Sequence, residues 1–266
     1  MGVVISMINN KGGTGKTTTA VNLAAGLAGV GFRVLILDLD SQASASLSLG
    51  VSAEGPSMAD ALFDSVPLSQ AIRATSVPML DLAPGVMELA NSDVILVDLP
   101  GRENRLREQI GTLGNNYDVI ICDCPPSLSL LVINALVASD HCLVCVSPDY
   151  LAFEGLIALT RVIERLRRSM GIDVHMLGIL MTMVNPGLNL TKTIAEKIRS
   201  RYGAIVFQCE LRRDVKLSEA PFHGKSIFDH APTSAGAKAY GRLVQEVLSR
   251  CKLPAPAVIS PASSQS

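Results

Sequence analysis

The 266-residue sequence predicts a single α/β domain whose doubly wound, mostly parallel sheet is flanked by helices. One observation is that aliphatic runs at residues 3–8 and 33–38 are separated by a segment, 18–30, that is typical of a helix. Such alternation favours a parallel sheet with helices on both faces. The other observation is a glycine-rich stretch, K-G-G-T-G-K-T at residues 11–17, between the first run and the first helix.

Composition and hydropathy favour one large folded unit. Apolar residues make up 48% of the chain and tryptophan is absent, so we expect a largely aliphatic core. The folded domain is expected over residues 1–250, and a tail rich in Pro, Ala and Ser over 251–266 is expected to be disordered. We see no apolar run of the roughly 18 residues that span a membrane and no leader segment, so we expect a cytoplasmic protein.

The charge distribution permits a basic surface, and the positions of the cysteines argue against a zinc or redox site. The net charge is only −1, but residues 1–100 carry 4 Lys/Arg against 9 Asp/Glu (−5), and residues 101–266 carry 19 against 15 (+4). This asymmetry permits a basic face on the C-terminal half. Cys142 and Cys145 have C-x-x-C spacing, but they lie in an apolar run that predicts a buried strand. We therefore expect reduced core cysteines rather than a zinc or redox site.

The glycine-rich stretch carries chemistry as well as a turn. It fits the phosphate-loop pattern G-x-x-x-x-G-K-[ST], with Asn10 at the first glycine position. Glycines let backbone N–H groups converge on phosphate oxygens, and the following helix directs its positive end at them. Lys16 would reach the β- and γ-phosphates and Thr17 would bind Mg²⁺. The alternative, an ordinary glycine-rich turn, leaves the adjacent Gly-Lys-Thr unexplained.

A second lysine in the same loop, Lys11, makes the motif distinctive. The spacing resembles the deviant Walker A motif of the ParA/MinD family of ATPases, in which the first lysine reaches across a dimer interface to the partner's nucleotide. The resemblance implies ATP and Mg²⁺ as ligands and Lys11 and Lys16 as catalytic residues. The expected phosphate-binding residues are Lys11, Gly12, Gly13, Thr14, Gly15, Lys16, Thr17 and Thr18.

Two aspartates follow the second aliphatic run. Ligands of open α/β sheets bind beyond the carboxyl ends of strands, so Asp38 and Asp40 should lie beside the phosphate loop. The alternative is ordinary capping of a strand end. The segment resembles the family's D-x-D-P-Q element, with Ser41 in place of proline. The resemblance implies that Asp40 lies in a switch region, is needed for hydrolysis and contributes to the metal site.

Two later runs each end in an aspartate, Val94–Asp98 and Val119–Asp123, and periodicity alone cannot choose the Walker B strand. The D-x-P-P-S pattern that begins at Asp123 resembles the family. It implies that Asp123 holds Mg²⁺ through water, and that Asp98 lies in a loop or at a strand end before a helix near Glu103. Further helices are expected at residues 58–63, 129–139, 153–170, 191–201 and 234–250, and strands at 79–83, 141–146 and 174–181.

The resemblance extends to the second half of the chain. It implies that Glu154 lies near the nucleotide at a dimer interface, although an acid that favours a helix start is the alternative. It also implies that Met183, Arg212 and Asp214 bind the nucleotide near its base, with Arg212 where the family usually has proline.

The family resemblance further implies weak ATP hydrolysis, an ATP-dependent homodimer, nonspecific DNA binding and a ParB-like or other stimulating partner. Together these segregate or position a plasmid, a chromosome or another assembly, with the protein on the nucleoid in its ATP state. The DNA-binding residues expected from the basic half of the chain are Arg199, Arg201, Arg213, Lys216 and Arg242. Alternatively, these are scattered charges that acidic neighbours neutralise.

Three other functions fit the sequence less well. A MinD-like spatial regulator that binds membranes would end in a basic amphipathic helix, which the prolines after Lys252 disfavour. A reductase such as the nitrogenase iron protein would need cysteines that bridge subunits through a cluster, and a small-molecule kinase would need an acceptor pocket. A positioning ATPase that uses a platform other than DNA remains the alternative.

Overall fold

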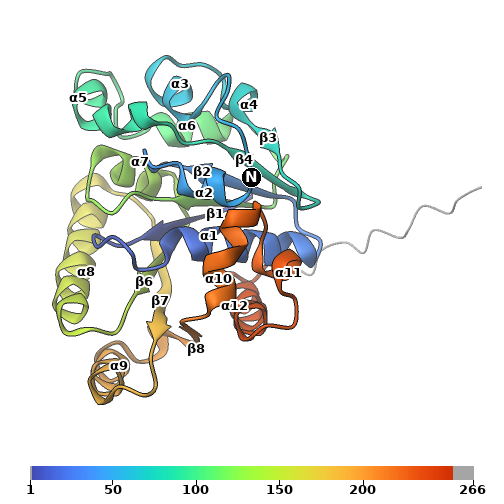
Figure 1. Cartoon of the computed structure of the whole chain (residues 1–266). Coiled ribbons are helices and arrows are strands. Elements are labelled where there is room, and N and C mark those ends of the chain that lie inside the picture. Colours follow the sequence, from blue (N-terminus) through green and yellow to red (C-terminus); the bar gives the residue numbers. More distant parts are fainter. Residues whose placement is uncertain (1, 254–266) are drawn as a thin grey trace, which may run out of the picture.

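The computed structural model describes residues 2–253, and Figure 1 shows one sheet between two layers of helices. The strand order is β3-β4-β2-β5-β1-β6-β7-β8, and every pairing is parallel except that of β3 with β4. The predicted doubly wound sheet is thereby confirmed. The strands are β1 (Val3–Ile8), β2 (Val34–Asp38), β3 (Arg73–Ala74), β4 (Leu80–Ala83), β5 (Val119–Asp123), β6 (His141–Val146), β7 (His175–Val184) and β8 (Val206–Arg212).

Helices cover both faces because the central strands are apolar on both sides. One core packs α3, α4, α5, α6, α7, α8 and α9 against the sheet, and the other packs α1, α2, α11 and α12. The helices are α1 (Lys16–Gly29), α2 (Ser44–Ser48), α3 (Met58–Phe63), α4 (Leu68–Ala71), α5 (Ser92–Val97), α6 (Arg105–Gly111), α7 (Leu130–Ala138), α8 (Tyr150–Met170), α9 (Asn189–Tyr202), α10 (Val215–Glu219), α11 (Ile227–His230) and α12 (Ala235–Cys251), with short 3₁₀ turns η1 (Met87–Asn91), η2 (Gly203–Ile205) and η3 (Ala220–His223).

The centre of the sheet brings the functional loops together. β1 lies between β5 and β6, and β2 lies on the other side of β5. In this register Asp123 lies opposite both Met7 on β1 and Asp38 on β2. Since all three strands end at the same edge, the loops that follow them converge on one site.

One predicted element is wrong in kind. The run Val94–Val97 belongs to a helix, α5, and Asp98 is the residue that caps its C-terminus rather than a strand end. Only Leu96 of the run is buried, and Val94 is 74% exposed. A run of four apolar residues is too short to distinguish a buried strand from one turn of a surface helix.

Smaller differences concern the ends of the chain and the cysteines. The edge strand β8 was not predicted, and α12 continues to Cys251, one residue into the expected tail. The expected disorder of that tail concerns residues 254–266, which lie outside the described part of the chain. All six cysteines are unpaired, and Cys142 and Cys145 are buried, as expected for core residues. Within residues 2–253, no helix is long and apolar enough to cross a membrane, and no cluster of three His, Cys, Asp or Glu residues could hold a metal ion.

Candidate nucleotide site

The glycine-rich loop runs from the end of β1 to the start of α1. Gly13 and Gly15 adopt φ angles of 71° and 76°, a conformation that residues with a Cβ rarely adopt. Gly15 is the N-cap residue of α1, and no side chain caps this helix. The first N–H groups of α1 therefore remain available to an anion, as a phosphate loop requires.

Lys16 lies inside this loop rather than on the surface. Its side chain is only 6% exposed, and its Nζ donates to the carbonyl oxygen of Lys11 at 3.4 Å. Within residues 2–253 it forms no ion pair with a carboxylate. A buried ammonium that has only a carbonyl partner is suited to an anionic ligand.

Lys11 makes a different set of contacts. Its Nζ lies 2.9 Å from Oδ2 of Asp149, and both side chains are about half exposed. Asp149 also caps α8 by accepting a hydrogen bond from the Ala152 N–H at 2.8 Å. Although burial alone would raise the pKa of Asp149, the hydrogen bonds from Lys11 and Ala152 lower it. The first lysine of the motif is thus held at the rim of the site.

Two side chains that the sequence analysis did not select support the loop. Asn9 donates to the carbonyl oxygen of Cys145 and accepts from the Lys11 N–H at 3.0 Å. Thr182, on β7, donates to the carbonyl oxygen of Thr14 at 2.8 Å. These contacts tie the loop to β6 and β7. No local sequence pattern identifies the contact between Thr182 and the loop.

Asp38 and Asp123 form the acidic side of the site. Both are completely buried and lie opposite each other on β2 and β5. Asp38 accepts hydrogen bonds from the N–H and the hydroxyl of Ser46, at 2.9 and 2.7 Å. Neither carboxylate oxygen of Asp123 has a hydrogen-bond partner within the described residues.

Burial raises the pKa of both carboxyl groups. For Asp123, the nearby charge of Asp38 raises the pKa further, whereas the Thr17 hydroxyl and the Lys16 ammonium favour the ionised form. A buried carboxylate with two unpartnered oxygens next to a threonine hydroxyl has the chemistry of a divalent-cation site. The residues Thr17 and Asp123 therefore fit the Mg²⁺ that the motif implies.

Asp40 lies just beyond β2, as expected, in a partly exposed loop. Its N–H donates to Oδ1 of Asp38 at 3.3 Å, and its own Oδ1 accepts from the Gln42 N–H at 3.0 Å. Gly85, which follows β4, packs directly on this loop: a Cβ at Gly85 would lie 2.6 Å from the carbonyl oxygen of Asp40. Gly85 was missed because its partner is 45 residues earlier in the chain.

A cavity of about 570 Å³ opens beside the loop. It is lined by Gly15 and Thr18 and by the predicted nucleotide-binding residues Met183, Arg212 and Asp214. Five residues predicted to bind the nucleotide thus share one cavity, although they come from three distant parts of the chain. Glu154 does not line it, and lies exposed on α8 next to Gly155.

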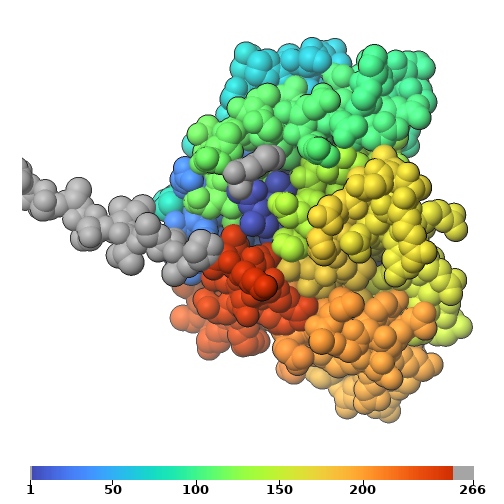
Figure 2. All heavy atoms as spheres, turned by 180° about the vertical axis from the view of Figure 1, so that it is seen from behind, coloured from blue at the N-terminus to red at the C-terminus, as the bar shows by residue number. Residues whose placement is uncertain are grey.

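The residues predicted to bind DNA differ in their surroundings. Two are already ion-paired: Arg199 with Glu210 and Lys216 with Glu219, each at 2.8 Å. The Arg201 guanidinium lies 5.8 Å from the centre of the Tyr202 ring. Within residues 2–253, neither Arg213 nor Arg242 forms an ion pair. From behind, the α9 region (orange) and α12 (red), which carry Arg199, Arg201 and Arg242, lie next to each other (Figure 2).

Comparisons with known proteins agree with this site. A family profile described as an AAA domain matches residues 2–176. The sporulation initiation inhibitor protein Soj of Bacillus subtilis is 41% identical over 249 residues, which cover 93% of this chain and 98% of Soj. The chain belongs to the ParA/MinD family of ATPases, as a ParA/Soj-type member. The chromosome partitioning protein ParA of Myxococcus xanthus is 38% identical over 252 residues, covering 94% of this chain and 89% of that protein.

A solved structure of this P-loop fold is similar over nearly the whole chain. It is the cobyrinic acid a,c-diamide synthase of Mycobacterium smegmatis with bound ADP and magnesium, with a TM-score of 0.83 and 28% identity. The similarity covers 98% of this chain and 100% of that one. Membership of the ParA/MinD family thus rests on sequence similarity, and this structure shows the shared fold.

Proposed function

We propose that this ParA/Soj-type protein binds ATP with Mg²⁺ and hydrolyses it slowly to ADP and phosphate. The observation that carries the proposal is the pair formed by the buried Lys16 in an uncapped glycine loop and the buried, unpartnered Asp123. Among the described residues, the Lys16 ammonium has no anionic partner and the Asp123 carboxylate has no hydrogen-bond partner. A magnesium nucleotide supplies both.

Each residue has a distinct task in this proposal. Bound Mg²⁺, held by Thr17 and by Asp123 through water, with Asp40 nearby, would neutralise negative charge that develops on the phosphate oxygens. Lys16 compensates charge on the β- and γ-phosphates, and Asp40 orients the attacking water. The loop N–H groups that hold the phosphates belong to Gly12, Gly13, Thr14, Gly15, Lys16, Thr17 and Thr18. Met183, Arg212 and Asp214 border the cavity for the base.

Dimerisation is the next part of the proposal. Lys11 lies at the rim, half exposed, and makes only one ion pair among the described residues. Its position supports a role on the nucleotide of a second subunit, with Glu154 near that interface. Hydrolysis then depends on the ATP-bound dimer, which accounts for a weak activity of the free chain.

A cellular role is proposed next, with support from relatives that are chromosome partitioning proteins. We propose that the ATP-bound dimer binds DNA without sequence preference in the cytoplasm, on the nucleoid, and that a ParB-like partner stimulates hydrolysis. The cargo is a chromosome, a plasmid or another large assembly. The proposed DNA contacts are Arg199, Arg201, Arg213, Lys216 and Arg242.

The decisive experiment compares wild type with Lys16→Ala. Titration with an ATP analogue should show Mg²⁺-dependent binding to wild type and at least a tenfold loss of affinity in the variant. Lys238→Ala, which removes an exposed lysine on α12, is the matched control and should bind like wild type. Equal nucleotide binding by wild type and Lys16→Ala would refute the phosphate site.

A further inference from the structure

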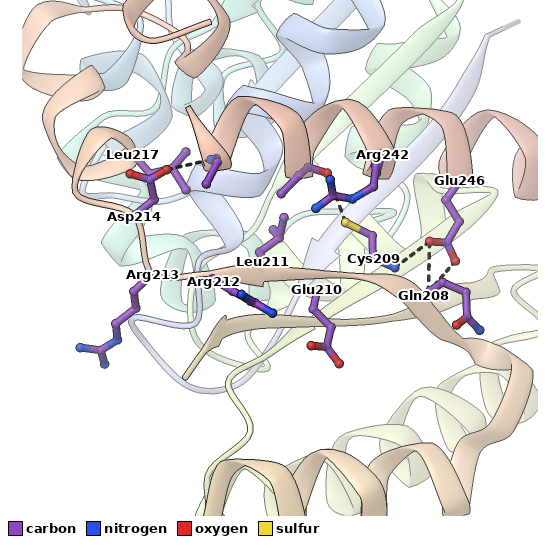
Figure 3. A pocket seen from close by; sticks show the side chains of 13 residues that line it. Gln208, Cys209, Glu210, Leu211, Arg212, Arg213, Asp214, Leu217, Arg242 and Glu246 are labelled. Carbon is purple, nitrogen blue, oxygen red and sulfur yellow. Dashed lines mark hydrogen bonds between the residues drawn. The ribbon is translucent and has the colours of Figure 1, made fainter. Parts of the chain in front are cut away.

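A second cavity, of about 490 Å³, lies between the edge strand β8 and helix α12. Figure 3 shows the helix above the strand and the cavity as a groove that follows both. β8 contributes Glu210, Leu211 and Arg212 to the wall, and one side of α12 contributes Ala235, Ala239 and Arg242. The three α12 residues recur at spacings of three to four, so they lie on one stripe of the helix.

The groove follows the free edge of the sheet. β8 is the last strand in the order, and β7 is its single strand neighbour within residues 2–253. A strand edge presents backbone N–H and C=O groups that can pair with another chain, and proteins commonly protect such edges. Any part of the β8 edge that is not protected is therefore a candidate for pairing with another chain.

Only the first half of β8 is protected. Ile179 and Met181 of β7 pair with Val206 and Glu210, so two steps along β7 match four along β8, and β8 bulges between them. The N–H groups of Gln208 and Cys209 in this bulge both donate to the carboxylate of Glu246, at 2.9 and 3.0 Å (Figure 3). Beyond the bulge, residues 210–212 border the groove, and no side chain on α12 covers them in this way.

The groove carries positive charge that the described residues do not neutralise. Its three carboxylates are already engaged: Glu210 with Arg199 at 2.8 Å, Glu246 with the bulge and Arg250, and Asp214 with two backbone N–H groups. Arg212 and Arg242 form no ion pair within residues 2–253. Arg242 points from α12 across the groove towards Cys209, whereas Arg213 points away from the helix (Figure 3).

We propose that this groove docks an extended, acidic peptide segment of a partner protein as an added strand along residues 210–212 of β8. Main-chain hydrogen bonds to the strand edge would give affinity, and carboxylates facing Arg212 and Arg242 would give selectivity. A small anion would use the guanidinium groups but leave the strand edge unpaired. A DNA duplex could likewise contact Arg213 and Arg242 through its phosphates, but it too would leave the strand edge unpaired.

The site also adjoins the proposed nucleotide cavity. Leu211, Arg212, Asp214 and Leu217 line both cavities. A peptide in the groove would therefore press on residues that border the nucleotide base. The docking itself does not depend on ATP hydrolysis, so its test is separate from that of the proposed function.

Peptide display provides the test. A library of random ten-residue peptides is selected on the wild-type full chain and counter-selected on Ala235→Trp, in which an indole fills the groove from an exposed position of α12. We expect enriched peptides with Asp or Glu at alternate positions. In fluorescence anisotropy, Ala235→Trp should weaken the binding of such a peptide at least tenfold, and Arg242→Glu should weaken its binding by a similar factor. Ala158→Trp, at an exposed position of α8, is the matched control and should bind like wild type.

A second measurement tests the strand geometry. Hydrogen exchange of the backbone amides in residues 210–213 should slow when the selected peptide binds, and should not slow with succinate, a small dicarboxylate. No enrichment of acidic peptides, or equal binding to Ala235→Trp, would overturn the proposal. The proposal would also fail if a 24-base-pair duplex displaced the peptide and Arg242→Glu bound neither the peptide nor the duplex. The guanidinium groups of the groove would then bind nucleic acid.

Discussion

Lys11 Nζ lies 2.9 Å from Oδ2 of Asp149, a residue 138 positions later in the chain, and this ion pair holds the first lysine of the loop against α8. An exposed pair of this kind contributes about 0–1 kcal/mol. The proposed exchange of this carboxylate for the phosphates of a second subunit would therefore cost Lys11 little free energy.

The Lys11 pair leads to the first prediction. Lys11→Ala should bind ATP about as tightly as wild type but hydrolyse it at least tenfold more slowly, because the proposed contact across the dimer is lost. Asp149→Asn removes the ion pair yet keeps a good helix cap, and it should retain most of the activity. Steady-state phosphate release checks both, and an unchanged rate in Lys11→Ala would leave Lys11 a surface residue.

The second prediction distinguishes the two aspartates that the sequence left in competition. Asp123→Asn should abolish Mg²⁺-dependent hydrolysis, because it removes the buried carboxylate proposed to bind the cation. Asp98→Asn, at the end of the surface helix α5, should hydrolyse ATP like wild type. Loss of activity in Asp98→Asn alone would reverse the assignment.

A third prediction concerns Asp40. Asp40→Ala keeps the phosphate loop intact but removes the carboxylate proposed to orient water, so hydrolysis should fall while ATP binding persists. The ATP-bound variant should then accumulate as a dimer in sedimentation velocity. A monomer at saturating ATP would contradict this role.

Gly85 gives a fourth prediction, on stability as well as activity. A Cβ in Gly85→Ala would lie 2.6 Å from a backbone oxygen of Asp40, so overpacking should lower the free energy of unfolding by about 1–3 kcal/mol. Displacement of the Asp40 loop should also slow ATP hydrolysis. Gly111→Ala, at the last residue of α6, would place a Cβ where nothing beyond its own helix and chain neighbours lies within 4 Å, so it should not destabilise the protein and should raise the free energy of unfolding by at most roughly 1 kcal/mol. Equal unfolding midpoints in urea for the two variants would contradict the contact.

The fifth prediction tests DNA binding. Arg213→Glu with Lys216→Glu should weaken binding of the ATP-bound protein to any duplex at least tenfold, because two phosphate contacts per subunit become repulsive. The affinity of wild type should fall steeply with salt and should not depend on sequence. Arg107→Glu, on the exposed side of α6, is the control. If ATP-bound wild type retains no duplex at low ionic strength, the platform is not DNA, and if the double variant binds like wild type, Arg213 and Lys216 are not the contacts.

Local patterns were sufficient to predict the strands and helices that follow one another in βαβ order. The helix at Met58–Phe63 has the predicted bounds, and its Ser57 cap bonds reciprocally with Asp60. The prediction of a strand at Val94–Val97 was wrong because the burial of these residues depends on which elements pack against them, and no local pattern encodes that packing. β8 was missed although its side chains alternate between buried and more exposed from Phe207 to Arg212, because three charged residues, Glu210, Arg212 and Arg213, obscure so short a pattern in the sequence.

The candidate site was predictable only where it is continuous in sequence. The residue types and spacing of the loop Lys11–Thr17 are sufficient to predict phosphate binding. The family resemblance was sufficient to choose Asp123 over Asp98. The contacts that shape the loop join residues far apart: Asn9 with Cys145, and Thr14 with Thr182. Such contacts form because the strand order brings these segments together, and local sequence patterns do not reveal the strand order.

The strand order also has a consequence for how the chain acquires its structure on the ribosome. β1 is the first strand to be synthesised, but its two neighbours, β5 and β6, end at Asp123 and Val146. At about 5–20 residues per second, roughly 7–30 s pass before both neighbours have been made. During that interval an apolar strand and the glycine loop behind it have no sheet to join. β1 therefore waits longer for both of its strand neighbours than any strand made after it.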